Sequence, residues 1–117
     1  ADFDQDGDPD VVMTQIGGPP LLLRNDQAIG NHWVRLRVVG RGGNPEAIGA
    51  WIHLKTDDGR RISRQVMPTK SYLSQSELPL HLGLGRSRIA EARIRWPDGS
   101  EASFTAPLQQ TTILRQQ

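Results

Sequence analysis

Hydrophobic and polar positions alternate along most of the chain, which is the pattern of half-buried β-strands rather than of amphipathic helices. Val34, Leu36 and Val38 share one face of a predicted strand at residues 31–39, and arginines occupy the other face. The same alternation predicts six further strands, at residues 48–55, 61–67, 78–84, 89–96, 102–105 and 111–115.

Turn-forming residues separate these segments, and they include the hairpin signals Asp57-Asp58-Gly59 and Pro97-Asp98-Gly99. Antiparallel strands with one wet and one dry face close their core by packing two sheets together. We therefore predict an all-β fold, an antiparallel β-sandwich that spans residues 31–117.

Residues 1–30 follow a different pattern. An acidic turn leads into a predicted strand at residues 11–15, and a Gly17-Gly18-Pro19-Pro20 turn connects this strand to a second one at residues 21–24. An isolated hairpin is only marginally stable in water. We therefore expect this hairpin to dock on the sandwich or on a second copy of the chain, with a junction at residues 25–30.

The formal charge of +1 conceals two oppositely charged parts. Residues 1–10 hold five Asp and no basic residue, whereas the remaining residues hold 14 Lys and Arg against 8 Asp and Glu. This asymmetry predicts a cation site or an electrostatic partner. No cysteine is present, which excludes disulfides and thiolate metal sites. No apolar run approaches the roughly 20 residues of a membrane span.

The acidic residues recur with the spacing DxDxDGxxD, formed by Asp2, Asp4, Asp6, Gly7 and Asp10. Carboxylates at alternate positions of a tight loop converge on one point, and Ca²⁺ takes about six to eight such oxygen ligands. Four side chains and the main-chain carbonyl of Asp8 would hold the ion. Met13 stands where an EF-hand requires a glutamate, so the loop is not an EF-hand.

The alternative interpretation of this loop is a solvated acidic turn, because Asp and Gly are good turn formers. Five carboxylates within nine residues repel one another, however, unless a cation or a proton relieves the repulsion. We therefore predict a Ca²⁺ site, and prefer Ca²⁺ to Mg²⁺ because Mg²⁺ demands a stricter octahedron.

Nothing in the sequence predicts catalysis. The chain has no GxSxG nucleophile motif, and His32, His53 and His81 lie on separate predicted strands without the spacing of a zinc site. Nucleic acid is not an expected partner, since no binding motif accompanies the arginines and the acidic head would repel phosphate. We expect a non-catalytic module.

A binding surface is the more promising feature. The outward faces of two predicted strands carry aromatic and cationic side chains, which are Trp33, Arg35 and Arg37 on one strand and Trp51 and His53 on the other. If the two strands pair, these residues form one surface that would hold a protein or an acidic glycan. The alternative is that neighbouring loops cover the tryptophans and the arginines merely solvate the sheet.

Two motif sets resemble known families. Residues 2–12, the Gly-rich turn and residues 21–25 resemble the tail of an FG-GAP (VCBS-type) repeat, a β-propeller blade unit. Most of residues 31–117 resembles the ASPIC/UnbV domain, through Asn31-His32-Trp33-Val34, Ala47-Ile48-Gly49-Ala50, Ser71-Tyr72-Leu73-Ser74-Gln75-Ser76, His81-Leu82-Gly83-Leu84-Gly85 and Arg95-Trp96-Pro97-Asp98-Gly99. This order of parts is similar to that of cartilage acidic protein-like proteins.

The resemblance implies that residues 1–24 are half of a last propeller blade, with calcium held by Asp2, Asp4, Asp6, Asp8 and Asp10. Its implied partners are the preceding propeller repeats of the same chain, and its implied location is secreted, cell-surface or periplasmic, with the targeting signal outside this fragment. It brings no catalytic residues. The expected function is recognition or adhesion within a larger protein, and the alternatives are an accessory domain of an extracytoplasmic enzyme or a structural cap of the propeller.

Overall fold

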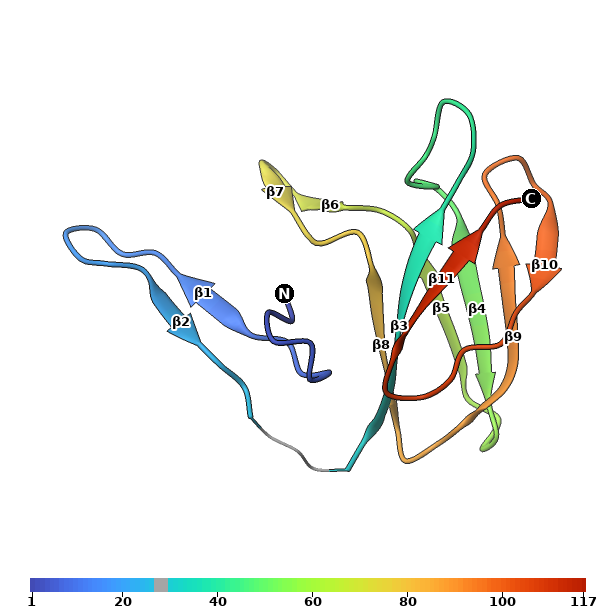
Figure 1. Cartoon of the computed structure of the whole chain (residues 1–117), viewed down its shortest axis with the longest axis horizontal. Helices are drawn as coiled ribbons and strands as arrows, with labels where there is room; N and C mark the ends of the chain where they lie inside the picture. The colour runs from blue at the N-terminus through green and yellow to red at the C-terminus, as the bar shows by residue number, and fades with distance from the viewer. Residues whose placement is uncertain (27–29) are drawn as a thin grey trace.

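The computed structural model describes residues 1–26 and 30–117, and their regular structure is entirely β (Figure 1). No helix in this part of the chain is long and apolar enough to cross a membrane. The strands are β1 (Val11–Met13), β2 (Leu21–Leu23), β3 (His32–Val39), β4 (Trp51–Thr56), β5 (Arg61–Gln65), β6 (Thr69–Ser71), β7 (Ser74–Gln75), β8 (Leu80–Gly85), β9 (Ile89–Arg95), β10 (Glu101–Ser103) and β11 (Thr111–Arg115).

Two sheets form the body of the molecule, and their facing side chains make one apolar core. One sheet has the strand order β10-β9-β4-β5, and the other has the order β11-β3-β8. The alternation in the sequence places the core correctly, because its inward positions are buried in both sheets. The largest fully buried side chains are Leu36, Ile52, Leu84, Val34, Val66 and Thr56. The predicted all-β sandwich is confirmed.

One strand pair runs against the expected antiparallel pattern. β11 pairs with β3 in parallel, from Thr111 opposite Arg35 to Arg115 opposite Val39. β10 lies in the opposite sheet, so the chain crosses from one sheet to the other before β11. A crossover connection of this kind permits a parallel pair, whereas a tight hairpin would not.

The sequence misplaced the start of β4 by three residues and missed one hairpin. β4 begins at Trp51 rather than at residue 48, because the chain turns there through hydrogen bonds from the Ala47 amide to the Asn44 carbonyl and from the Ala50 amide to the Ala47 carbonyl. The small hairpin β6–β7 has no apolar alternation, since it lies away from the core. Its tip carries Tyr72 and Leu73, each 90% exposed.

The N-terminal hairpin forms as predicted, with β1 and β2 antiparallel and Val11 opposite Leu23. It extends away from the sandwich rather than lying along it (Figure 1). The six apolar side chains of its strands are between 44% and 61% exposed. The expected junction at residues 25–30 includes residues 27–29, which lie outside the described residues.

Candidate metal centre

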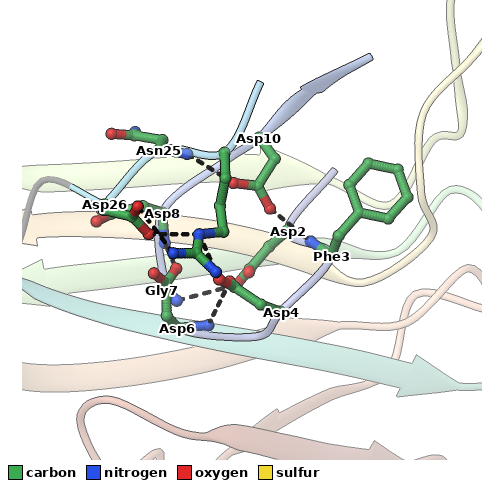
Figure 2. A network of polar contacts seen from close by, with 10 residues as sticks. Asp2, Phe3, Asp4, Asp6, Gly7, Asp8, Asp10, Asn25 and Asp26 are labelled. Carbon is green, nitrogen blue, oxygen red and sulfur yellow. Dashed lines mark hydrogen bonds and ion pairs between the residues drawn. The ribbon is translucent and has the colours of Figure 1, made fainter. Parts of the chain in front are cut away.

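The acidic loop that precedes β1 is curled by main-chain amides that donate to its own carboxylates (Figure 2). The Gly7 amide donates to Oδ2 of Asp2 at 3.0 Å, and the Asp8 amide donates to Oδ1 of Asp6 at 2.9 Å. A longer bond of 3.3 Å joins the Asp6 amide to Oδ1 of Asp4. These bonds turn alternate aspartates toward the inside of the loop, as the spacing predicts.

Asp10 ties this loop to the far end of the hairpin. Its Oδ2 accepts the Phe3 amide at 2.8 Å, and its Oδ1 accepts the Asn25 amide at 2.9 Å. These two donors hold the pKa of the Asp10 carboxyl below its ordinary value, with the Asn25 bond contributing most. Asp10 is therefore ionised and fixed, and each of its oxygens keeps a second lone pair for another ligand.

The carboxylates gather into two overlapping groups. Oxygen atoms of Asp2, Asp4 and Asp10 lie within 4.8 Å of one another, and so do those of Asp4, Asp6 and Asp26. The structure places three of the four predicted side-chain ligands, Asp2, Asp4 and Asp10, in one group, whereas Asp6 lies with Asp4 in the other. The side chain of Asp8 belongs to neither group among the described residues.

The first group has the chemistry of a cation site. Asp2 is only 5% exposed, and its Oδ1 is buried without a hydrogen-bond partner in the described structure. A buried acceptor without a partner is costly, and the cost is greater for a charged group. Partial burial, reinforced by the charges of Asp6 and Asp10, raises the pKa of the Asp4 carboxyl. A divalent cation would relieve both conditions, so the residues fit Ca²⁺.

Two residues of this cluster were not found from the sequence. Arg24 lies between Asp26 and Asp4, with its Nε 2.7 Å from Oδ1 of Asp26 and 3.8 Å from Oδ2 of Asp4. The hydrogen bond to Asp26 raises the pKa of the Arg24 guanidinium. The predicted hairpin could have revealed both residues. A hairpin that starts directly after the acidic loop brings the chain back to this loop at residues 24–26.

The loop also touches the sandwich, through Gly7. This residue has a φ of +104°, and a Cβ placed on it would lie 2.0 Å from Nε1 of Trp33. Only glycine allows the backbone to approach the ring so closely. Trp33 in turn stacks on His81, with ring centroids 5.3 Å apart. A hollow of about 580 Å³ remains between the loop and this aromatic pair.

The predicted aromatic and cationic surface does not form as a single unit. It required β3 and β4 to pair, and these strands lie in different sheets. Trp33 therefore belongs to one outer face, whereas Trp51 stacks on His53 on the other, with ring centroids 6.1 Å apart. On the Trp33 face, Arg35 is ion-paired with Glu77 and Arg37 is exposed.

Comparison with known proteins confirms that the sandwich resembles the ASPIC/UnbV domain. The family described as ASPIC and UnbV matches residues 40–117. The chain is 31% identical to cartilage acidic protein 1 of Mus musculus and 30% identical to that of Homo sapiens, each over 105 residues and 87% of the chain. These alignments are longer than the family match, so they extend into the first 39 residues.

The chain spans only 16% of the length of these relatives. The similarity to them therefore concerns one part of a much longer protein. The family match itself covers two thirds of the chain and includes every strand of the sandwich except β3. The chain belongs to the ASPIC and UnbV family.

Proposed function

We propose that the chain is a non-catalytic recognition module of a larger protein, and that its N-terminal loop binds Ca²⁺. The observation that carries the calcium proposal is the buried Oδ1 of Asp2, which has no hydrogen-bond partner in the described structure and lies in the carboxylate group formed with Asp4 and Asp10. Asp6 and the carbonyl of Asp8 would complete the set of ligands. A bound ion would neutralise the clustered carboxylates and so stabilise the curled form of the loop.

The exposed hairpin supports the other part of the proposal, that the chain is one module of a larger protein. Successive residues of a strand point to opposite faces, and in β1 and β2 every residue is exposed, so both faces lack a cover. A strand pair that is apolar on both faces suits a position between two other layers. We infer that preceding repeats of the FG-GAP (VCBS) type supply these layers in the full protein. A secreted or cell-surface location follows from the same inference.

Calorimetric titration of Ca²⁺ into chelator-treated protein tests the calcium proposal. We expect saturable binding to one site, absent in Asp4→Asn because this residue belongs to both carboxylate groups. Asp2→Asn should abolish binding as well, whereas Asp26→Asn should weaken it only slightly. A melting experiment in calcium and in chelator should show higher stability of the loop with the ion, as linkage requires.

Asp8→Asn is the matched control, because it removes the same charge from the same loop but keeps the main-chain carbonyl. It should bind Ca²⁺ within about threefold of the wild type, since only long-range charge is lost. The proposal fails if the wild-type chain gives no heat of binding. It also fails if Asp8→Asn loses as much affinity as Asp4→Asn, because a diffuse acidic surface would then explain the binding.

A further inference from the structure

We propose that the outer face of the sheet β10-β9-β4-β5 is a docking surface for an acidic polypeptide segment. This deepens the proposed recognition role by assigning it a surface and a class of partner, and it rests on that role. It does not depend on calcium, because the surface lies wholly within the sandwich.

The strand register places aromatic, cationic and hydroxyl groups side by side on this face. Trp51 lies opposite Arg95 on one neighbouring strand and Gln65 on the other, and His53 lies opposite Arg93 and Ser63. These two sets of opposed residues are the first and second rows across the face. In the third row, Lys55 lies opposite Glu91 and Arg61. A shallow hollow of about 340 Å³ covers the second and third rows.

The charge of this face is positive, because cations outnumber carboxylates by two. It holds four cations, Lys55, Arg61, Arg93 and Arg95, against the two carboxylates Glu91 and Glu101. Arg93 is paired with Glu101 at 2.7 Å. The other three cations have no acidic partner within ion-pair distance among the described residues. Side chains of this kind attract a partner that carries carboxylates.

The outer face of the other sheet, β11-β3-β8, provides the reason for choosing a polypeptide as the partner. There an equivalent pair, Trp33 stacked on His81, is partly covered by a Gly-containing acidic turn of the chain itself, which contacts the Trp33 ring through Gly7. The pair Trp51–His53 has similar chemistry, with parallel rings at 6°. Its surroundings differ, because His53 and the neighbouring side chains of β5 and β9 are largely open to solvent. An acidic turn of a partner protein would fit this face in the same way.

Fluorescence polarisation with a labelled ten-residue peptide of alternating Asp and Gly tests the proposal, with an Asn-Gly peptide as the uncharged probe. The double variant Arg61→Ser/Arg95→Ser removes two unpaired cations from the face, and Trp51→Ala removes the aromatic contact. We expect each change to weaken binding of the Asp peptide by about tenfold, the cost typical of a central interface residue. The Asn-Gly peptide should not bind measurably.

The matched control is Arg37→Ser/Arg115→Ser, which removes the same charge from exposed positions on the other sheet. It should change affinity by less than about twofold, as rim charges do. Equal losses in the two double variants would overturn the proposal, since net charge alone would then explain binding. Binding of heparin at this face without binding of the Asp peptide would replace the polypeptide by an anionic polysaccharide.

Failure of this proposal can be separated from failure of the proposed calcium site. The Asp peptide should bind Asp4→Asn as tightly as it binds the wild-type chain, in calcium and in chelator. Loss of peptide binding in Asp4→Asn would overturn the assignment of the surface to the sandwich face. Absence of peptide binding to the wild-type chain overturns the docking surface, whatever the calcium titration gives.

Discussion

The first 26 residues and the sandwich are held together in opposite ways. In the sandwich, the apolar side chains of β3, β4, β8 and β9 are turned inward and buried, and the charged side chains face water. In the N-terminal part, the apolar side chains of β1 and β2 are exposed, and the buried side chains include Asp2 and Asp10. Apolar burial therefore stabilises one region, and hydrogen bonds to carboxylates shape the other.

This difference leads us to expect that the two regions depend on their surroundings to different degrees. A sandwich with a continuous core obtains its stability within the chain, since apolar burial is the dominant favourable term in folding. A two-stranded hairpin with exposed apolar faces is marginal alone and depends on what covers it. We therefore expect the sandwich to fold without the N-terminal part, and the hairpin to gain stability only from a covering surface.

The largest test of the contrast compares one leucine from each region. Leu36→Ala should lower the free energy of unfolding of the sandwich by about 2–5 kcal/mol, because Leu36 is fully buried and its truncation leaves a cavity. Leu22→Ala, at a side chain that is 61% exposed, should change it by less than about 0.5 kcal/mol. Urea unfolding followed by tryptophan fluorescence measures both. Similar losses in the two variants would contradict the contrast.

The sequence predicts the sandwich better than the N-terminal site, because local patterns encode more of the sandwich. Alternation is a local signal, so it located β3, β9 and β11, and it predicted the buried face of β3. Strand order and the parallel pairing of β11 depend on a crossover between sheets, which no local pattern records. Ser71–Gln75 carries no alternation because its hairpin lies away from the core.

The aspartate spacing is also a local signal, and it predicted the curled loop correctly. The second carboxylate group was missed because Asp26 reaches the loop only after the hairpin returns, sixteen residues after Asp10 in the sequence. The separation of Trp33 from Trp51 was missed for a similar reason. Adjacent strands in the sequence need not be neighbours in a sheet, and β3 and β4 are not.

A second test distinguishes two effects of an alanine at a glycine with positive φ: loss of the contact between the loop and Trp33, and strain in the backbone. Gly7→Ala should detach the loop from the sandwich, because the new Cβ would overlap the Trp33 ring and the φ of +104° disfavours a side chain. Hydrogen exchange measured by NMR should show lost protection of the Phe3, Gly7 and Asn25 amides. The indole resonance of Trp33 should shift at the same time.

Gly17→Ala is the matched control for this test. Its φ is +77°, but a Cβ there would meet nothing within 4 Å. It should cost only local strain of about 1–2 kcal/mol within the hairpin turn. The amides of the loop and the Trp33 resonance should stay as in the wild-type chain. An unchanged Trp33 resonance in Gly7→Ala would contradict the contact between the two regions.

The smallest effect concerns an aspartate of the sandwich that needs no cation. Asp58 accepts hydrogen bonds from the hydroxyls of Thr56 and Ser87 and from the Arg60 amide, and these lower the pKa of its carboxyl to about 2. The ionised group therefore stabilises the folded state fully above its unfolded pKa of about 3.9. This contribution is lost as the pH falls through about 2.

Unfolding measured between pH 6 and pH 2 in the wild-type chain and in Asp58→Asn isolates this contribution, because the other carboxyls cancel in the difference. We expect a constant difference in unfolding free energy above about pH 4 that shrinks toward pH 2. Ser87→Ala removes one donor, so it should raise the pKa of Asp58 and move this decline to higher pH. A difference in unfolding free energy that stays constant down to pH 2 would mean that these hydroxyls do not stabilise the ionised carboxylate of Asp58. Asp58 and Asp2 would then no longer differ in whether hydrogen-bond donors stabilise the carboxylate. The buried Oδ1 of Asp2 lacks such a donor among the described residues.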